Sequence, residues 1–201
     1  MMKPEDVHQS LALIQETLVK ARREFFSPDG PVYRCWGFAV GIAFALTHLV
    51  VSHRDRVGTW TGVTIGSIWM VATLVAMGYT YRHYASLRGV SSPAGRRIWL
   101  VWMISILLLL LTVGLTGSFN WLVGIWAVYT VSILYLMMGA LYFDNLQMCT
   151  GLWLGLANLF AARLGEGVYD LAMALLGGGG LIVAGLLHDR IRAGRDYGEP
   201  R

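Results

Sequence analysis

The stretch IWLVWMISILLLLLTVGLTGSFNWLVGIWAVYTVSILYLMMGALYF, from Ile98 to Phe143, contains no Asp, Glu, Lys, Arg or His. At 1.5 Å of rise per residue, a helix of this length is about twice as long as a bilayer's hydrocarbon layer of roughly 30 Å is thick. Residues Thr116–Asn120 form its only turn-like break. Because helices of soluble proteins keep a charged face toward water, this stretch predicts two transmembrane helices joined by a tight turn.

The composition of the whole chain is also that of a membrane protein. Of its 201 residues, 56% are hydrophobic and only 14% are charged, values typical of the membrane class. The first residues, Met1 to Glu24, are polar and carry carboxylates, so they do not form a cleavable signal peptide. The two cysteines, Cys35 and Cys149, have no metal-ligand spacing and are too few for a disulfide framework. We expect both to be free thiols.

Apolar runs separated by Gly, Pro or charged residues predict six membrane spans. The expected fold is all-α, a polytopic membrane protein with six transmembrane helices preceded by an amphipathic cytoplasmic helix. The expected parts are a cytoplasmic helix and turn at 1–30, a six-helix transmembrane bundle at 31–188 and a basic cytoplasmic tail at 189–201. The expected spans are 32–51, 59–81, 98–115, 120–142, 147–162 and 168–187.

Lysine and arginine residues are distributed unevenly between the two sides of such a bundle. Six spans place both termini on one side. The N-terminal segment together with Arg34 at the start of the first span, the loop 82–97 and the tail hold thirteen of the sixteen Lys and Arg residues. The opposite side has only Arg54, Arg56 and Arg163. Because cytoplasmic loops carry the excess of Lys and Arg, both termini are expected in the cytoplasm.

The first 26 residues show a heptad pattern. Pro4, Glu5 and Asp6 are typical of a helix N-terminus. Apolar residues then recur at alternating spacings of four and three, at Val7, Leu11, Ile14, Leu18, Ala21 and Phe25. Such a helix either rests on the membrane surface or the protein's own loops, or pairs with a partner or a second copy. The narrow seam favours docking on protein, with Leu11, Ile14 and Leu18 as the partner-binding residues.

Pairs of glycines four residues apart occur in three of the expected spans. Such spacing lets another helix backbone approach closely in a membrane. We therefore expect helix packing at Gly37, Gly41, Gly62, Gly66, Gly151 and Gly155. The run Gly177–Gly180 lies in an apolar span with no Lys-Ser/Thr after it, so it is not a phosphate loop. It is expected to permit close packing or a helix distortion.

Ionisable residues within a membrane mark ion paths or substrate sites, and this chain has few of them. Glu166 and Asp170 lie one helical turn apart at the start of the last span, where Arg163 is close enough to pair with them; this pattern is typical of a capping and anchoring cluster.

His48 is the one histidine inside a span, and the chain offers no second buried imidazole for a bis-histidine haem. We therefore expect no metal and no cofactor, with a single pigment or haem at His48 as the alternative left open. His48, Tyr129 and Asn158 are candidates to line one small polar cavity, and Asn158 could also hydrogen-bond another helix.

Catalytic and nucleic-acid-binding signatures are absent from the sequence. It contains no Walker A loop, no Gly-x-Ser-x-Gly elbow and no His-Glu-x-x-His zinc motif. The basic face has no recognisable nucleic-acid module, and the charge asymmetry of membrane proteins explains it. We expect no catalytic residues, no enzymatic activity and no nucleic-acid partner.

Several local patterns resemble a family of small, uncharacterised bacterial integral membrane proteins. They are Leu13-Ile14 with Leu18 and Lys20-Ala21, then Asp29-Gly30, then Tyr33 and Trp36-Gly37, and a last span from Tyr169-Asp170-Leu171 to Gly185-Leu186-Leu187. The chain departs from the family at Ala184-Gly185, where a Pro-Gly pair is expected. The resemblance implies a six-span protein of the bacterial inner membrane, with an N-terminal cytoplasmic helix and a Trp-Gly start to the first span. It implies no activity, cofactor or catalytic residue.

Together these patterns favour a non-enzymatic accessory, scaffold or assembly protein that acts through helix contacts in a larger membrane complex or a homo-oligomer. Its expected partners are the lipid bilayer and other membrane protein subunits or a second copy. The main alternative is a small-solute transporter or channel with an uncharged pathway, interrupted at Gly177–Gly180. A membrane sensor that signals through the N-terminal helix is a further alternative.

Overall fold

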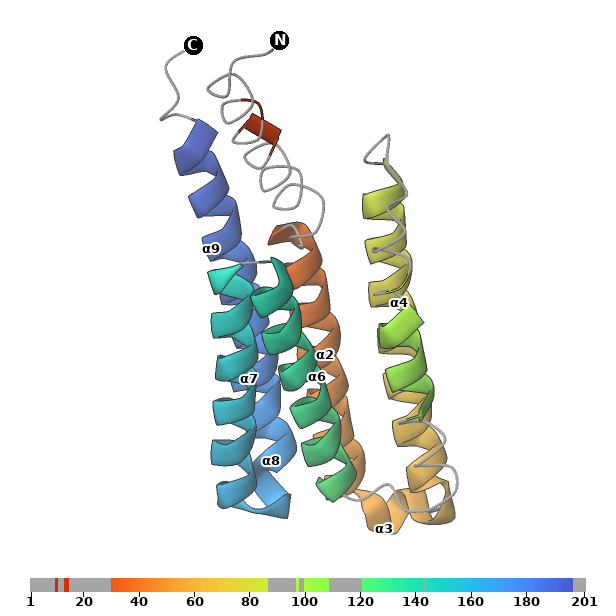
Figure 1. Ribbon diagram of the computed structural model, residues 1–201. Helices are drawn as coiled ribbons and strands as arrows, with labels where there is room; N and C mark the ends of the chain where they lie inside the picture. The colour runs from red at the N-terminus through yellow and green to blue at the C-terminus, as the bar shows by residue number, and fades with distance from the viewer. Residues whose placement is uncertain are drawn as a thin grey trace.

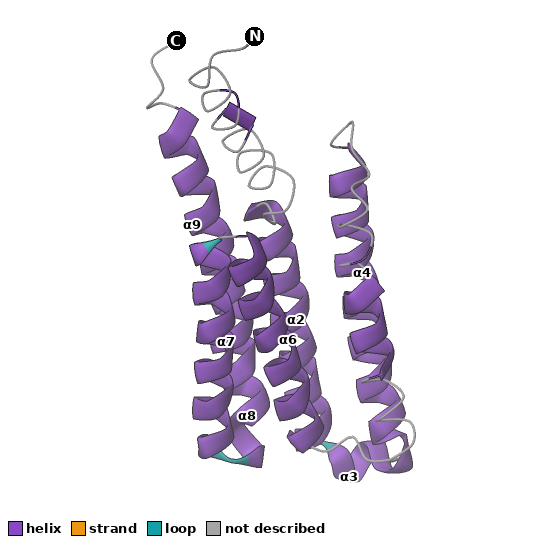
Figure 2. Cartoon of the chain, viewed as in Figure 1, coloured by secondary structure: helices purple, strands orange, loops and turns teal. Residues whose placement is uncertain are grey.

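The computed structural model describes residues 10, 13–14, 30–86, 97, 100–108, 121–142 and 144–196, the last five of these by their backbone only. Within these ranges all regular structure is helical (Figure 2). Leu11 and Leu18 of the expected N-terminal seam lie outside the described residues. Leu13 and Ile14 are helical, and both side chains are exposed.

Nine helical elements have defined bounds, and residues 100–108 are helical as well. They are α2 (Gly30–Ser52), α3 (Arg54–Val57), a 3-10 turn η1 (Gly58–Trp60), α4 (Thr61–Ser86), α6 (Trp121–Tyr142), α7 (Asn145–Leu164), α8 (Glu166–Met173), a π-helical segment η2 (Ala174–Gly178) and α9 (Gly179–Asp196).

Four of the described helical stretches are long and apolar enough to cross a membrane. They are Gly30–Ser52, Arg54–Ala85, Trp121–Tyr142 and Glu166–Ile191. The expected fifth span is the helix α7, of 20 residues, but it is not among these four. Its polar residues Gln147 and Asn158 are buried, at 1% and 0% exposure, so its polar side faces protein. Half of the expected third span, residues 98–99 and 109–115, lies outside the described residues.

The helices run alternately up and down (Figure 1). α2 packs against α9 and α4, and α6 packs against α7. The start of α2 and the end of α9 lie at the same end of the bundle, where the side chain of Asp189 contacts Gly30. α4 stands to one side, next to α2.

Two glycines of the expected first span lie where α2 crosses the last helix. A Cβ atom on Gly37 would lie 2.8 Å from the backbone oxygen of Gly178, and one on Gly41 would lie 3.3 Å from that of Ala174. A Cβ on Gly178 would lie 2.6 Å from Cα of Gly41. Only residues without side chains allow two backbones to approach this closely.

A second close approach joins α6 and α7. A Cβ on Gly151 would lie 2.8 Å from the backbone oxygen of Ser132, and one on Gly155 would lie 2.9 Å from the Ser132 hydroxyl. That hydroxyl donates a hydrogen bond to the backbone oxygen of Gly151 at 2.7 Å. By contrast, a Cβ on Gly62 would have no described atom within 4 Å, and Gly66 is half-buried.

The connection between α2 and α4 is helical for one turn. Its residues Ser52–Arg56 are polar, and this composition predicts a short loop between the first two spans. Instead, Arg54–Val57 form the single helical turn α3. Gly58 lies four residues before Gly62, but with its φ of 60° it begins the 3-10 turn η1 and does not continue the glycine face of α4. This left-handed conformation favours glycine and lets the chain turn from α3 into α4.

The last span contains a π-helix. Residues Ala174–Gly178 form one wide turn between α8 and α9, which overlaps the expected distortion at Gly177–Gly180 only at Gly177 and Gly178. The indole N–H of Trp153, on α7, donates to the backbone oxygen of Leu176 at 2.9 Å. The same indole contacts Gly180 at the position a Cβ would take. The glycines therefore make room for Trp153 beside the wide turn.

Two tryptophan–threonine hydrogen bonds attach α4 to α2. The indole of Trp36 donates to the Thr80 hydroxyl at 3.1 Å, and that of Trp69 donates to the Thr47 hydroxyl at 3.2 Å. Each threonine donates its own proton to a carbonyl one turn earlier in its helix. Its oxygen is therefore free to accept from the tryptophan of the neighbouring helix.

Candidate functional site

The most extensive buried polar group centres on Asn158 of α7, which is fully buried. Its amide nitrogen donates to the backbone oxygen of Ile125 on α6 at 2.9 Å. Its amide oxygen accepts a hydrogen bond from the Tyr169 hydroxyl on α8 at 2.7 Å. Both ends of the amide are therefore used to join three helices, which is the polar role within membranes that its position predicted.

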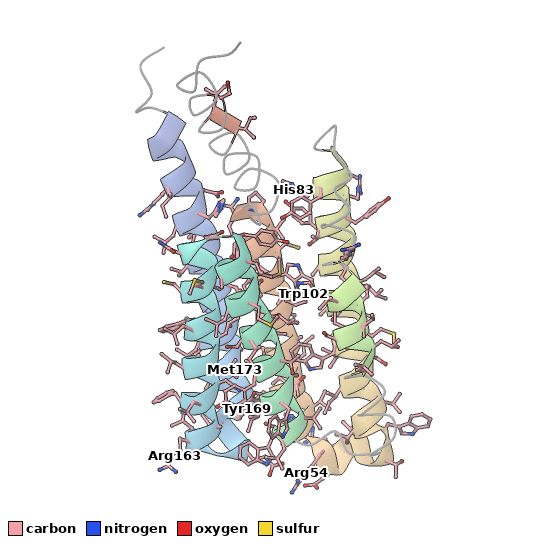
Figure 3. The ribbon with its side chains drawn as sticks, viewed as in Figure 1. Arg54, His83, Trp102, Arg163, Tyr169 and Met173 are labelled. Carbon is pink, nitrogen blue, oxygen red and sulfur yellow. The ribbon has the colours of Figure 1, made fainter. Side chains whose placement is uncertain are left out.

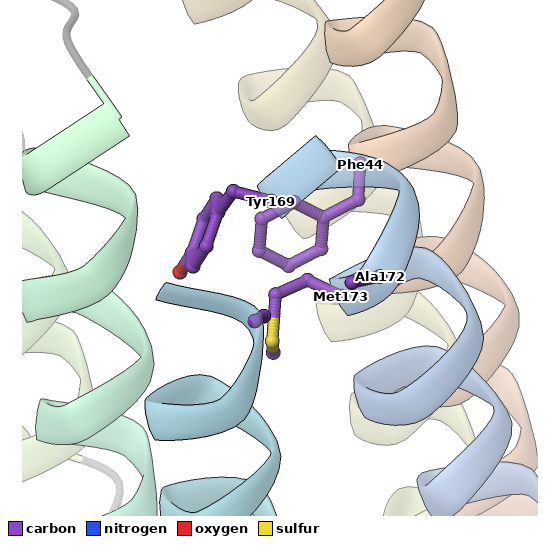
Figure 4. Packing of buried hydrophobic residues seen from close by; sticks show 5 residues of the cluster. Phe44, Tyr169, Ala172 and Met173 are labelled. Atoms are coloured by element: carbon purple, nitrogen blue, oxygen red, sulfur yellow. The ribbon is translucent and has the colours of Figure 1, made fainter. Parts of the chain in front are cut away.

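Tyr169 is held by aromatic rings on the other side. Its ring lies edge to face with Phe44, at a centroid distance of 6.0 Å, and with Trp121, at 6.2 Å. A Cβ atom on Gly124 would lie 3.1 Å from the Tyr169 ring. Figure 4 shows Tyr169 packed with Phe44, Ala172 and Met173. The ring fills the space between α2, α6 and α8, so this region is packed core.

Asp170 follows Tyr169 and is also buried, at 8% exposure. Its carboxyl group interacts electrostatically with the imidazole of His48, on α2, and with Glu166, one turn earlier. Tyr129 lies near enough to Tyr169 for an electrostatic interaction. Of the three expected cavity residues, Asn158 hydrogen-bonds Tyr169, whereas Tyr129 and His48 lie within electrostatic range of Tyr169 and Asp170, respectively.

The expected anchoring cluster is only partly formed. Glu166 lies in the first turn of α8, where the helix dipole favours a carboxylate. Arg163 is exposed and makes no ion pair with either carboxylate among the described residues.

Metal ligands and disulfides were not expected from the sequence. Anywhere among the residues that the structure describes, no three His, Cys, Asp or Glu side chains come together as a set of metal ligands. Cys35 and Cys149 are free thiols.

A second polar group lies at the other end of the bundle. Tyr33 of α2, at 1% exposure, stacks at a tilt on Tyr135 of α6 and on His188 of α9, with centroid distances of 5.9 and 6.3 Å. Trp102 packs edge-on against Tyr135 at 5.8 Å. The amide oxygen of Gln147 is buried without a hydrogen-bond partner among the described residues.

The start of α7 and an ion pair surround this second group. The Asp144 carboxylate caps α7 by accepting from the backbone N–H groups of Leu146 and Gln147, at 3.0 and 3.1 Å. Arg34 and Asp189 form an ion pair of 2.6 Å between α2 and α9. Their side chains are 34% and 38% exposed, so water screens the pair.

Tyr33 opens the first expected span, where an amphipathic aromatic residue is typical of headgroup depth, and its burial among other helices was not predicted from the sequence. A signal was nevertheless present, because Tyr33 precedes Gly37 and Gly41 at the same spacing of four residues. Residues at this spacing lie on one face of a helix. The helix that approaches the two glycines therefore also covers Tyr33.

Comparison of the chain with protein-family models, with curated proteins and with solved structures found no match.

Proposed function

We propose that this protein is a non-enzymatic scaffold or assembly protein of the bacterial inner membrane, which acts through helix contacts with other membrane proteins or with a second copy. The observation that carries the proposal is the hydrogen bonding of the buried Asn158 side chain. Polar side chains that line a solute path present free donors and acceptors to it. Both ends of the Asn158 amide are instead taken up by Ile125 and Tyr169 of neighbouring helices.

The proposed orientation has six spans and both termini in the cytoplasm. In Figure 3, Arg54 and Arg163, two of the three cations expected outside, lie at the end opposite His83. The basic residues Arg34 and Arg82 lie toward the end at which α2 begins and α4 ends. An excess of Lys and Arg at one end of the helices supports a cytoplasmic location of that end.

The N-terminal helix is the proposed contact with the partner. Ile14, on the heptad seam, is 54% exposed, so its side chain is available to another surface. Burial of a Leu or Ile side chain contributes about 1.5–3 kcal/mol, and three seam residues could hold a partner helix.

The test changes the seam and leaves the spans unaltered. In the double variant Leu11→Asp with Leu18→Asp, we expect loss of the oligomer or co-purifying partner on a native gel, with membrane insertion unchanged. The matched control is Leu13→Asp with Val19→Asp, which places the same charges off the seam. An unaltered assembly in the seam variant, or equal loss in both variants, would contradict the proposal.

A small-solute transporter or channel is the second candidate. It is favoured by the π-helix at Ala174–Gly178, since π-helical turns are frequent at functional sites, and by the buried amide oxygen of Gln147, which has no hydrogen-bond partner among the described residues. Flux of labelled solutes into liposomes that contain the purified protein separates the two candidates. Solute entry by the protein alone favours a transporter; a tight liposome together with a stable complex on a native gel favours the scaffold.

A further inference from the structure

The side of α4 carries a shallow groove that neither the Asn158 group nor the helix contacts use. Its volume is about 560 Å³. The lining residues recur at the spacing of one helix stripe: Leu74, Val75, Gly78, Tyr79, Arg82 and His83. We call this the α4 groove. It lies beside the face on which Trp69 and Thr80 bind α2.

The α4 groove is apolar in its first half. Leu74 and Val75 are 63% and 62% exposed. Gly78 is exposed as well, and a Cβ atom there would have no described atom within 4 Å. The glycine therefore leaves an open notch one helical turn from two exposed apolar side chains, and such a surface suits a hydrocarbon chain.

The other half of the α4 groove is basic and aromatic. Arg82 is exposed and makes no ion pair with any residue that the structure describes. The ring of Tyr79 stacks on the imidazole of His83, with a centroid distance of 6.1 Å and an angle of 11°. Tyrosine is typical of headgroup depth, and a guanidinium group matches the geometry of a phosphate.

The two halves follow one another along the helix axis. Leu74 and Arg82 are eight residues apart, or about 12 Å at the rise of an α-helix. The basic half points to the end of the bundle that the charge distribution assigns to the cytoplasm, which is the side where anionic lipids concentrate. A ligand bound along α4 would therefore have its apolar part against Leu74 and Val75 and its polar part near the Arg82 cation, at the level of the lipid headgroups.

We propose that an anionic phospholipid occupies the α4 groove, with its phosphate on Arg82 and the start of an acyl chain against Leu74, Val75 and Gly78. The charge complementarity of Arg82 selects this lipid over a zwitterionic one, in which the headgroup cation offsets the phosphate. The inference goes beyond the scaffold function and uses only the membrane orientation proposed with it. Lipid binding measured in detergent depends neither on the scaffold function nor on that orientation.

The experiment measures lipid retention. Detergent-solubilised protein is incubated with equal amounts of phosphatidylglycerol and phosphatidylcholine, and bound lipid is counted by native mass spectrometry. The unaltered protein should prefer phosphatidylglycerol. Arg82→Gln should weaken this preference about fivefold, the effect of one arginine near an anionic headgroup, and Gly78→Leu should reduce binding by filling the notch.

The matched control is Arg54→Gln, which removes an exposed arginine from α3 at the opposite end; it should retain the preference. Elution volume and melting temperature show whether each variant is folded. Equal retention of both lipids by the unaltered protein would overturn the proposal without any variant. An unchanged preference in both Arg82→Gln and Gly78→Leu would also overturn it, as would an equal loss in Arg54→Gln.

Discussion

The crossing of α2 with the π-helical segment gives the sharpest test of the packing, because two adjacent glycines differ there in their surroundings. A Cβ on Gly178 would lie 2.6 Å from Cα and 2.8 Å from N of Gly41, and 2.9 Å from the backbone oxygen of Gly37. A Cβ on Gly179 would have no described atom within 4 Å. The variants Gly178→Ala and Gly179→Ala therefore add the same methyl group. In Gly178→Ala it meets the backbone of α2, and in Gly179→Ala it meets no described atom.

The expected magnitudes follow from two opposing terms. Alanine stabilises a helix interior by about 1 kcal/mol relative to glycine, and this term applies to both variants. Overpacking costs about 1–3 kcal/mol. The upper end applies to Gly178→Ala, because all three close atoms belong to backbone and cannot rotate away. We expect Gly178→Ala to destabilise the protein by about 2 kcal/mol and Gly179→Ala to stabilise it by up to about 1 kcal/mol.

The assay is thermal unfolding of the detergent-solubilised protein, followed by tryptophan fluorescence. Irreversible unfolding makes the midpoint depend on scan rate, so all samples use one rate. A difference of about 3 kcal/mol corresponds to about 6–12 °C for a chain of this size. Midpoints of the two variants that agree within about 1 °C, or a higher midpoint for Gly178→Ala, would refute the close approach of α2 to the last span.

Three further predictions concern a buried hydrogen bond, an ion pair between helices and the orientation of the chain in the membrane. Tyr169→Phe leaves the buried amide oxygen of Asn158 without its donor, so the unfolding free energy should fall by about 1–2 kcal/mol; an unchanged melting midpoint would contradict the hydrogen bond. Arg34→Gln should cost at most about 1 kcal/mol, because the pair with Asp189 is partly exposed, and a larger loss that persists in high salt would show a role beyond this pair. Reporter fusions after Arg201 and in the loop between α2 and α4 should report opposite sides of the membrane; the same side at both sites would refute the assignment of spans.

The sequence predicted helix positions well where polar residues interrupt apolar runs. The first span was expected at 32–51, and α2 covers Gly30–Ser52; the fourth was expected at 120–142, and α6 covers Trp121–Tyr142. Charged or glycine-containing segments end these runs, and both kinds of residue are unfavourable in the middle of a membrane. The link at Asp144 also proved to be a helix boundary, since its carboxylate caps α7.

The sequence predicted less well which face of each helix packs against protein than where each helix begins and ends. In water an apolar stripe marks the buried face, but lipid tails are as apolar as leucine, so apolar residues face lipid and protein alike. Tyr33, for example, was expected at headgroup depth, and its burial within the protein, at 1% exposure, was not predicted. Small and polar residues carry the remaining signal. The hydrogen bond from Asn158 to another helix was predicted in this way, whereas Asp170 was assigned to a capping cluster and Tyr169 was given no packing role.

The π-helical turn also sets the rotational phase of the last span. Its buried residues Tyr169, Met173, Gly177 and Leu181 follow one another at a spacing of four. In a regular α-helix each such step advances about 40° around the axis, so the face would turn by about 120° from the first residue to the last. The wide turn holds one additional residue, which takes back about 100°. One buried face therefore continues from Tyr169 to Leu181. If the same residues formed a regular α-helix, Leu181 and Ala184 of α9 would instead be rotated by about 100° away from that face.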